Sequence, residues 1–139
     1  MTKSIVSLFA ILLFSCSNSD NYKKPDDPLE AGREFIEAAL NGNMKKARLF
    51  ILKDPANERL FDEIEKKYKG FSTAEKAAYK DASIRVNKSQ NLNDSTTIIN
   101  YSNSYKKENN QIKLVKQNNE WWVDFKYTFT GDTTNAVEK

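Results

Sequence analysis

The sequence predicts an α+β domain: N-terminal helices packed on a four-stranded antiparallel meander sheet. Two observations predict it. Apolar residues recur at helical spacing from residue 28 to about residue 80, and after Asp81 the apolar period changes to two. A chain that places its helices first and its strands afterwards is expected to pack the helices on one sheet face. We expect a signal peptide over 1–15, a cysteine and flexible linker over 16–26, one domain over 27–130 and a tail over 131–139.

Capping residues and helix breakers mark four helices. Asp27 can cap the first helix, Pro28 suits its first position, and Asn41-Gly42 ends it. Its apolar face comprises Leu29, Gly32, Phe35, Ile36, Ala39 and Leu40. The remaining boundaries are predicted at Asn43 for a short second helix, at Pro55 and Gly70 for a third, and at Ser72 for a last helical turn through Tyr79.

Four strands are predicted over 82–90, 95–106, 111–117 and 120–129, with short Asn-rich connections that favour hairpins. A loop at Asn118-Asn119 pairs Val115 with Trp122 and sets Lys113 opposite Asp124. The other two loops are expected at Leu92-Asn93 and Glu108-Asn109, which pair Val86 with Ile99, Ile84 with Tyr101 and Tyr105 with Ile112.

One parity satisfies all three hairpins, as expected for strands with one buried face. It places the larger apolar residues together, and Trp122 and Val115 on the opposite, polar face. The apolar set is Ile84, Val86, Ile99, Tyr101, Tyr105, Ile112, Leu114, Trp121, Val123, Phe125 and Tyr127.

The N-terminus has the features of a secretory signal peptide. Lys3 precedes an apolar run over 5–14, which is too short to cross a bilayer as a helix and ends at Leu13-Phe14-Ser15-Cys16. This tetrapeptide resembles the lipobox of bacterial lipoproteins, whose cysteine is lipidated on sulfur and becomes the first mature residue. The resemblance implies a lipid anchor at Cys16 and a place in the cell envelope. Ser17 resembles outer-membrane sorting in diderm bacteria, on either the periplasmic or the surface side.

Composition excludes several classes of function. Cleavage before Cys16 removes one lysine and no acid, so the formal charge falls from +3 to +2, too balanced for nucleic-acid binding. The chain contains no histidine, which argues against the usual zinc and haem sites and against catalytic triads that need it. Cys16 is the only cysteine, so no intramolecular disulfide forms. We expect no cofactor and no metal.

The domain also resembles small bacterial lipoproteins of unknown function. The matching segments are the opening helices, from Asp27-Pro28-Leu29-Glu30-Ala31 to Asn41-Gly42-Asn43 and Lys46-Ala47, and the closing segment Lys113 to Asp124 with its Trp-Val strand. The resemblance implies a cystatin-like, nuclear-transport-factor-2-like fold in which helices pack into a curved antiparallel sheet. Its motifs are structural, and that fold hosts both enzymes and binding modules.

Aromatic side chains are the candidate functional residues. Tyr101, Tyr105, Tyr127 and Trp121 share the face that the helices cover, where they could line a small-ligand pocket or simply fill the core. On the opposite face, Trp122 beside Val115 could contact a second copy of the sheet or another envelope protein. Alternatively, Trp122 is a single exposed aromatic residue that the stems of Lys113 and Lys126 half-cover.

These observations favour a non-catalytic envelope lipoprotein that is anchored to the membrane through its lipid and binds a small ligand or a protein. The contrasting hypothesis is a small isomerase-like or dehydratase-like enzyme with a buried pocket carboxylate beside a tyrosine. The sequence offers no clear candidate for that carboxylate.

Overall fold

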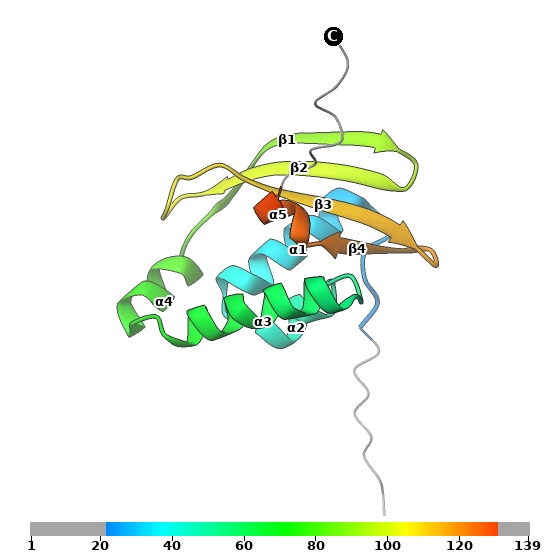
Figure 1. The fold of residues 1–139 in the computed structure, drawn as a ribbon. Helices are drawn as coiled ribbons and strands as arrows, with labels where there is room; N and C mark the ends of the chain where they lie inside the picture. The colour runs from blue at the N-terminus through cyan, green and yellow to red at the C-terminus, as the bar shows by residue number, and fades with distance from the viewer. Residues whose placement is uncertain (1–21, 131–139) are drawn as a thin grey trace, which may run out of the picture.

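Helices and strands segregate into two layers in the computed structural model, which describes residues 22–130 (Figure 1). The helical layer contains α1 (Pro28–Leu40), α2 (Met44–Arg48), α3 (Pro55–Lys69) and α4 (Thr73–Lys80). The sheet contains β1 (Ile84–Asn93), β2 (Thr96–Asn103), β3 (Asn110–Gln117) and β4 (Glu120–Asp124), and a short helix, α5 (Lys126–Thr130), follows it. The predicted α+β class is confirmed. None of these helices is long and apolar enough to cross a membrane.

The predicted helix starts are confirmed by their caps. The Asp27 side chain accepts the Glu30 N–H at 3.0 Å, and the Asn43 side chain accepts the Lys46 N–H at 3.0 Å. Ser72 and Glu75 form a reciprocal capping box at the start of α4. Each cap satisfies backbone donors that the helix leaves free, and typically contributes about 1 kcal/mol.

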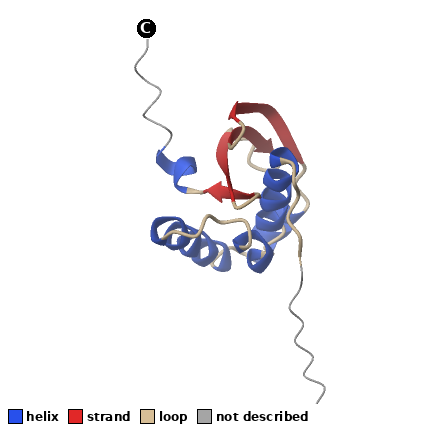
Figure 2. Cartoon of the chain, turned by 90° about the vertical axis from the view of Figure 1, so that its right-hand side faces the viewer, coloured by secondary structure: helices blue, strands red, loops and turns tan. Residues whose placement is uncertain are grey.

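Helix α1 lies directly against the curved sheet (Figure 2). Gly32 makes this close approach possible, because a Cβ atom there would lie 2.5 Å from Cδ1 of Ile99 and 3.2 Å from Cδ1 of Leu114. A glycine inside a helix weakens it by roughly 0.5–1 kcal/mol. Here the glycine lets the helix reach a sheet surface whose contacting residues are fully buried.

The sheet order is β1-β2-β3-β4 with antiparallel neighbours, so the predicted meander is confirmed. The last hairpin has the predicted register: Val115 pairs with Trp122 and Lys113 with Asp124. Asn118 and Asn119 have φ values of 51° and 61°. These left-handed values are those of the two-residue turn that matches strand twist.

The predicted registers of the first two hairpins are wrong. Val86 pairs with Tyr101 rather than Ile99, and Ile112 pairs with Ile99 rather than Tyr105. Strand β1 carries two register shifts, and its turn to β2 comes later than predicted. Strand β2 ends at Asn103 because the carbonyl of that side chain accepts the N–H groups of the next turn, at 3.1 and 2.9 Å.

The fourth strand is also shorter than predicted. It ends at Asp124, and the chain turns into α5 because the Lys126 N–H donates to Oδ1 of the buried Asn57 at 2.8 Å instead of continuing the ladder. Tyr127 therefore lies on a helix. The Nζ of Lys113, from the polar sheet face, lies 5.8 Å from the Tyr127 ring centre.

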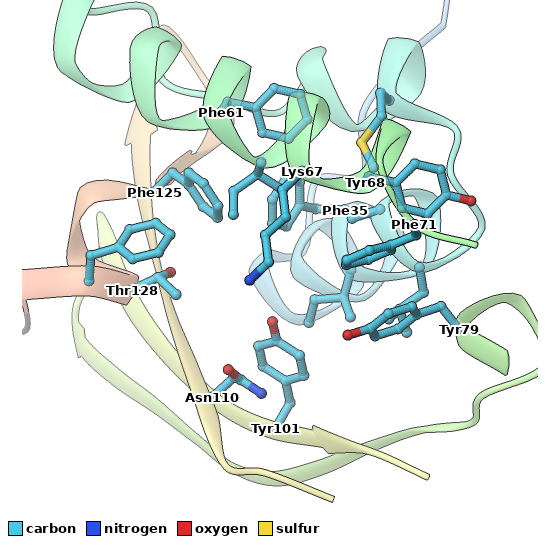
Figure 3. Close-up of a pocket in the computed structure, with 16 residues that line it drawn as sticks. Phe35, Phe61, Lys67, Tyr68, Phe71, Tyr79, Tyr101, Asn110, Phe125 and Thr128 are labelled. Atoms are coloured by element: carbon cyan, nitrogen blue, oxygen red, sulfur yellow. The ribbon is translucent and has the colours of Figure 1, made fainter. Parts of the chain in front are cut away.

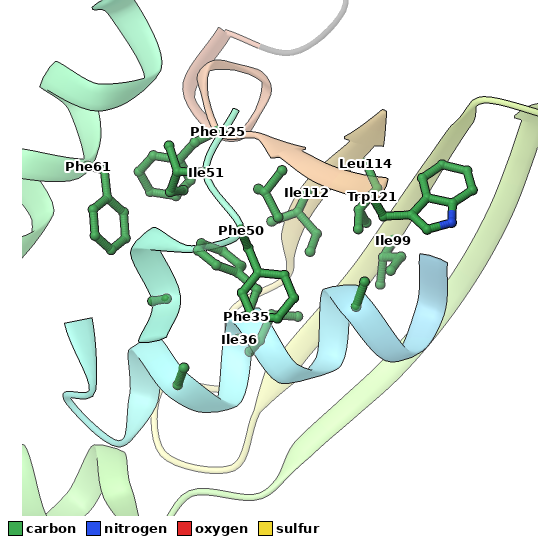
Figure 4. Packing of buried hydrophobic residues seen from close by; sticks show 14 of the residues in the cluster. Phe35, Ile36, Phe50, Ile51, Phe61, Ile99, Ile112, Leu114, Trp121 and Phe125 are labelled. Carbon is green, nitrogen blue, oxygen red and sulfur yellow. The ribbon is translucent and has the colours of Figure 1, made fainter. Parts of the chain in front are cut away.

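One hydrophobic core joins the helices to the sheet (Figure 4). It runs from Trp121 near the start of α1 to Phe61 and Phe125 at the other end. The outer edge of β4 is covered by the segment after α2: the Val123 N–H donates to the Phe50 carbonyl at 2.7 Å, and the Val123 carbonyl accepts the Leu52 N–H at 3.0 Å. This pairing fixes α2 and α3 to the sheet.

The segment before α1 packs on the domain, whereas the sequence predicted a flexible linker as far as residue 26. Tyr22 packs edge-on against Phe50 with ring centres 6.0 Å apart, and its hydroxyl donates to Glu34. Lys24 is 8% exposed, and the Asp26 carbonyl accepts the indole N–H of Trp121 at 2.9 Å. The segments predicted as signal peptide (1–15) and tail (131–139) lie outside the described residues, and so does Cys16.

We expect the free energy of unfolding to fall in acid, partly because the ion pairs between Arg48 of α2 and the carboxylates of α3 are lost. Nη2 of Arg48 lies 2.6 Å from Glu65 and 2.7 Å from Asp62. The hydrogen bond from Arg48, assisted by Lys69, lowers the pKa of Glu65. A carboxyl with a lowered folded pKa stabilises the fold above its unfolded pKa of about 4.3, and that contribution is lost as the pH falls through the folded value.

Urea unfolding of the wild type and of Glu65→Gln between pH 7 and pH 3 would measure this contribution. The variant should be less stable at pH 7 and converge with the wild type at pH 3. Glu63→Gln, on the same helix, serves as the control. A constant difference between Glu65→Gln and the wild type would exclude the linkage.

Candidate functional site

A cavity of about 260 Å³ lies between the helical layer and one end of the sheet (Figure 3). Its deep part is apolar and is formed by Phe35 and Ile36 from α1, Phe61 from α3, and Phe125 after β4. Its rim carries polar groups from several elements. The rim residues are Lys67 and Tyr68 of α3, Tyr79 of α4, Tyr101 of β2, Asn110 of β3 and Thr128 of α5.

A chain of aromatic contacts builds the α4 side of the cavity. Phe71 stacks on Tyr79 with ring centres 5.3 Å apart and planes 13° apart, and Tyr68 meets Phe71 edge-on at 5.8 Å. Tyr105 then packs edge-on against the outer side of Tyr79 at 4.9 Å. Such aromatic pairs each stabilise a protein by roughly 0.5–1.5 kcal/mol in addition to the contribution of their buried area. These contacts therefore stabilise this wall of the cavity.

Two polar side chains point toward each other across the cavity. The ammonium of Lys67 descends from α3, and the hydroxyl of Tyr101 rises from β2 to face it (Figure 3). Within residues 22–130, Lys67 forms no ion pair and the Tyr101 hydroxyl forms no hydrogen bond with another side chain or with the backbone. Both groups are thus free to bind a ligand.

Burial raises the pKa of Tyr101 to about 12. Burial also raises the pKa of Tyr79, a shift that the positive charge of Lys106 partly opposes. Both hydroxyls are therefore protonated at neutral pH and can donate a hydrogen bond. The Tyr101 hydroxyl, beside an ammonium, makes this end of the cavity a donor-rich site.

The structure separates the predicted ligand residues. Tyr101 lines the cavity as predicted. Tyr105 lies in the turn after β2 and reaches the cavity only through Tyr79, and Tyr127 lies on α5 on the side of Lys113. Trp121 is a core residue with 4% exposure at the opposite end of the sheet (Figure 4). Of the four, only Tyr101 is a cavity residue.

Trp122 and Val115 pair on the polar sheet face as predicted, and both are half-buried. The Nζ atom of Lys24, from the segment before α1, lies 3.0 Å from the centre of the Trp122 ring and 3.1 Å from Glu120. Burial lowers the pKa of Lys24, although the pairing with Glu120 opposes that shift. The lysine over Trp122 is therefore Lys24, from the N-terminal segment, and not one of the two lysines expected there. The Nζ of Lys113 lies 5.8 Å from the Tyr127 ring centre, and the Nζ of Lys126 lies 3.4 Å from Asp54.

No family model, curated protein or solved structure matches this chain. The chemistry of the site therefore rests on its own residues.

Sequence reasoning missed Lys67, Tyr79 and Asn110. The position of Lys67 in the sequence could have indicated its role. It follows Leu60 and Ile64 at helical spacing and so lies on the apolar face of α3, where a lysine is unexpected. Tyr79 and Asn110 carried no comparable signal, because only the packing of α4 and the register of β3 bring them to the cavity.

The cavity lining contains no aspartate, glutamate or cysteine, so it lacks the carboxylate on which the enzyme hypothesis depended. Within the described part of the chain, no group of three or more Cys, Asp or Glu side chains is placed to hold a metal ion. The arrangement suits the binding of a ligand that has an apolar body and accepts hydrogen bonds.

Proposed function

We propose that this protein is a lipid-anchored lipoprotein of the bacterial cell envelope whose domain binds a small ligand without transforming it. The observation that carries the proposal is the aromatic cavity with the free Lys67 ammonium and the free Tyr101 hydroxyl at its rim. Pockets of this kind, mostly apolar with a few convergent polar groups, are typical of small-molecule sites. The absence of a carboxylate from the lining favours binding over acid–base chemistry.

We further propose that the fold is cystatin-like, or nuclear-transport-factor-2-like. Helices that precede an antiparallel meander, with α1 against the curved sheet, support this assignment (Figure 2). In such an arrangement the sheet and the helices diverge at one end, which is where the cavity lies. The fold by itself does not specify the ligand.

Native mass spectrometry of the full chain, extracted from bacterial membranes in a detergent of known mass, tests the binding function. We expect the wild type to carry an additional small mass that is not detergent. Ala39→Phe places a ring in the cavity and should lose that mass, whereas Ala77→Phe, on an exposed position of α4 outside the cavity, should keep it. A wild type without bound mass, or Ala39→Phe with the mass retained, would contradict the proposal.

If Cys16 carries the lipid anchor, its replacement should abolish lipidation completely. Cys16→Ala should abolish incorporation of labelled palmitate and move the protein from the membrane fraction to the soluble fraction, because the thiol is the proposed acceptor of the lipid. Each buried lipid methylene contributes about 0.8 kcal/mol, so two or three chains hold a protein stably. Ser17→Ala should leave labelling unchanged. Palmitate incorporation into Cys16→Ala would exclude this site.

A further inference from the structure

The cavity is strongly asymmetric in polarity. Phe35, Phe61 and Phe125 form its deep part, with ring centres 5.9–6.4 Å apart and exposures of 7% or less. Lys67 and the other polar groups stand at the rim. A ligand that fills this cavity would therefore place an apolar portion at depth and a polar group near Lys67.

The charge at the rim is positive and uncompensated. Two other cations near α3 share an acidic partner: Lys69 lies 3.1 Å from Glu65, and Arg48 lies 2.6 Å from the same carboxylate. Lys67 has no such partner between residues 22 and 130, and no lining residue is acidic. An anionic group on the ligand would supply the missing charge.

The hydrogen-bonding groups beside Lys67 limit which ligand group can bind there, because some of them already have partners. The Thr128 hydroxyl already donates to the Gln111 carbonyl at 2.9 Å, and the Asn110 amide donates to the Glu108 carbonyl at 3.2 Å. The Tyr101 hydroxyl remains free, and it faces the ammonium across the cavity (Figure 3). An ammonium and a hydroxyl that converge on one point form a two-donor site for an oxyanion.

We infer that the ligand of this cavity is a small amphiphilic monocarboxylate, with its carboxylate held by Lys67 and Tyr101 and its apolar body against Phe35, Phe61 and Phe125. This inference rests on the proposed binding function and names the class of ligand. The volume of about 260 Å³ lies just below the roughly 300–1,000 Å³ usual for ligand pockets. The ligand is therefore a single short chain or ring rather than a phospholipid.

Calorimetric titration of the full-length lipoprotein in nanodiscs, with empty nanodiscs as the baseline, tests the inference. The probes are octanoate, octanol and octylamine, which share one apolar chain and differ in head group. We expect octanoate to bind most tightly. Lys67→Met should weaken octanoate binding about tenfold or more, and Tyr101→Phe roughly three- to tenfold, as expected for a charged and a neutral hydrogen bond.

Octanol should lose much less affinity than octanoate in Lys67→Met, because it carries no charge. Lys66→Met, an exposed neighbour on α3 outside the cavity, should bind octanoate like the wild type. Thermal unfolding of each variant verifies that it is folded.

Two results would overturn the carboxylate assignment and leave the binding function standing: octanol binding as tightly as octanoate with no effect of Lys67→Met, or octylamine binding most tightly. Failure of all three probes to bind the wild type would count against both the assignment and an apolar-ligand function. A clearly larger loss of affinity for octanoate than for octanol in Lys67→Met supports the inference.

Discussion

Replacing Asn57 by alanine is expected to lower the free energy of unfolding by about 3 kcal/mol. Asn57 is fully buried at the start of α3. Its amide donates to Asp54 at 2.6 Å and to Asp124 at 3.1 Å, and its carbonyl oxygen accepts the Lys126 N–H at 2.8 Å. A buried donor or acceptor left without its partner costs roughly 1–3 kcal/mol, so the loss of all three hydrogen bonds is severe.

The same substitution should loosen the cavity. The hydrogen bond from Lys126 to Asn57 is the contact that turns the chain from β4 into α5, and α5 contributes Thr128 and Phe129 to the cavity wall. Hydrogen exchange should therefore accelerate at the amides of α5 more than at those of β2 and β3. Ligand binding should weaken in parallel.

Urea unfolding and hydrogen exchange of Asn57→Ala, beside the wild type, measure both effects. Asn41→Ala provides a matched control, because Asn41 is exposed after α1 and its side chain has no hydrogen bond to the rest of the described domain. That variant should change stability by no more than about 0.5 kcal/mol. A loss below 1 kcal/mol for Asn57→Ala would show that the polar cluster is replaceable.

Replacing Trp121 by alanine is expected to cost about 3–5 kcal/mol, whereas the same change at the adjacent Trp122 should cost less than half of that. Trp121 is 4% exposed and packs in the core, and its indole N–H donates to the carbonyl of Asp26 in the segment before α1. Its removal leaves a large cavity and frees the segment before α1. Trp122 lies half-buried on the polar face under Lys24.

The two variants serve as controls for each other, since they remove the same side chain from neighbouring positions of β4. Thermal and urea unfolding of both would measure the difference. Trp121→Phe should recover most of the stability, because it restores ring burial and loses only the hydrogen bond to Asp26. Equal losses at the two positions would indicate that Trp122 is as deeply packed as Trp121, contrary to the structure.

The sheet registers show that apolar alternation predicts which face of a strand is buried but not which residues pair. Both incorrect hairpin registers are displaced by an even number of residues: in the first, Val86 pairs with Tyr101 instead of Ile99, and in the second, Ile112 pairs with Ile99 instead of Tyr105. An even displacement keeps each side chain on its face. Ile99 and Ile112 are therefore buried as predicted, although the predicted partners are wrong.

Local signals therefore determined much of this protein. Caps and glycines placed α1 to α4, alternation placed the strands and their inward faces, and the Asn118-Asn119 turn placed the last hairpin. Each of these signals depends on groups within a few residues of one another, such as a side chain that accepts a hydrogen bond from the next helical turn. Such contacts can be read from the sequence alone.

Only the tertiary structure decided the ends of β2 and β4, the packing of the segment before α1, and the composition of the cavity. The end of β4 depends on a side chain of α3, Asn57, and the cover over Trp122 depends on Lys24, from before the first helix. The cavity joins Lys67 to Tyr101, far apart in the chain. Long-range contacts of this kind arise from how the layers pack, and apolar periodicity does not encode them, because it specifies which face is buried and not what that face meets.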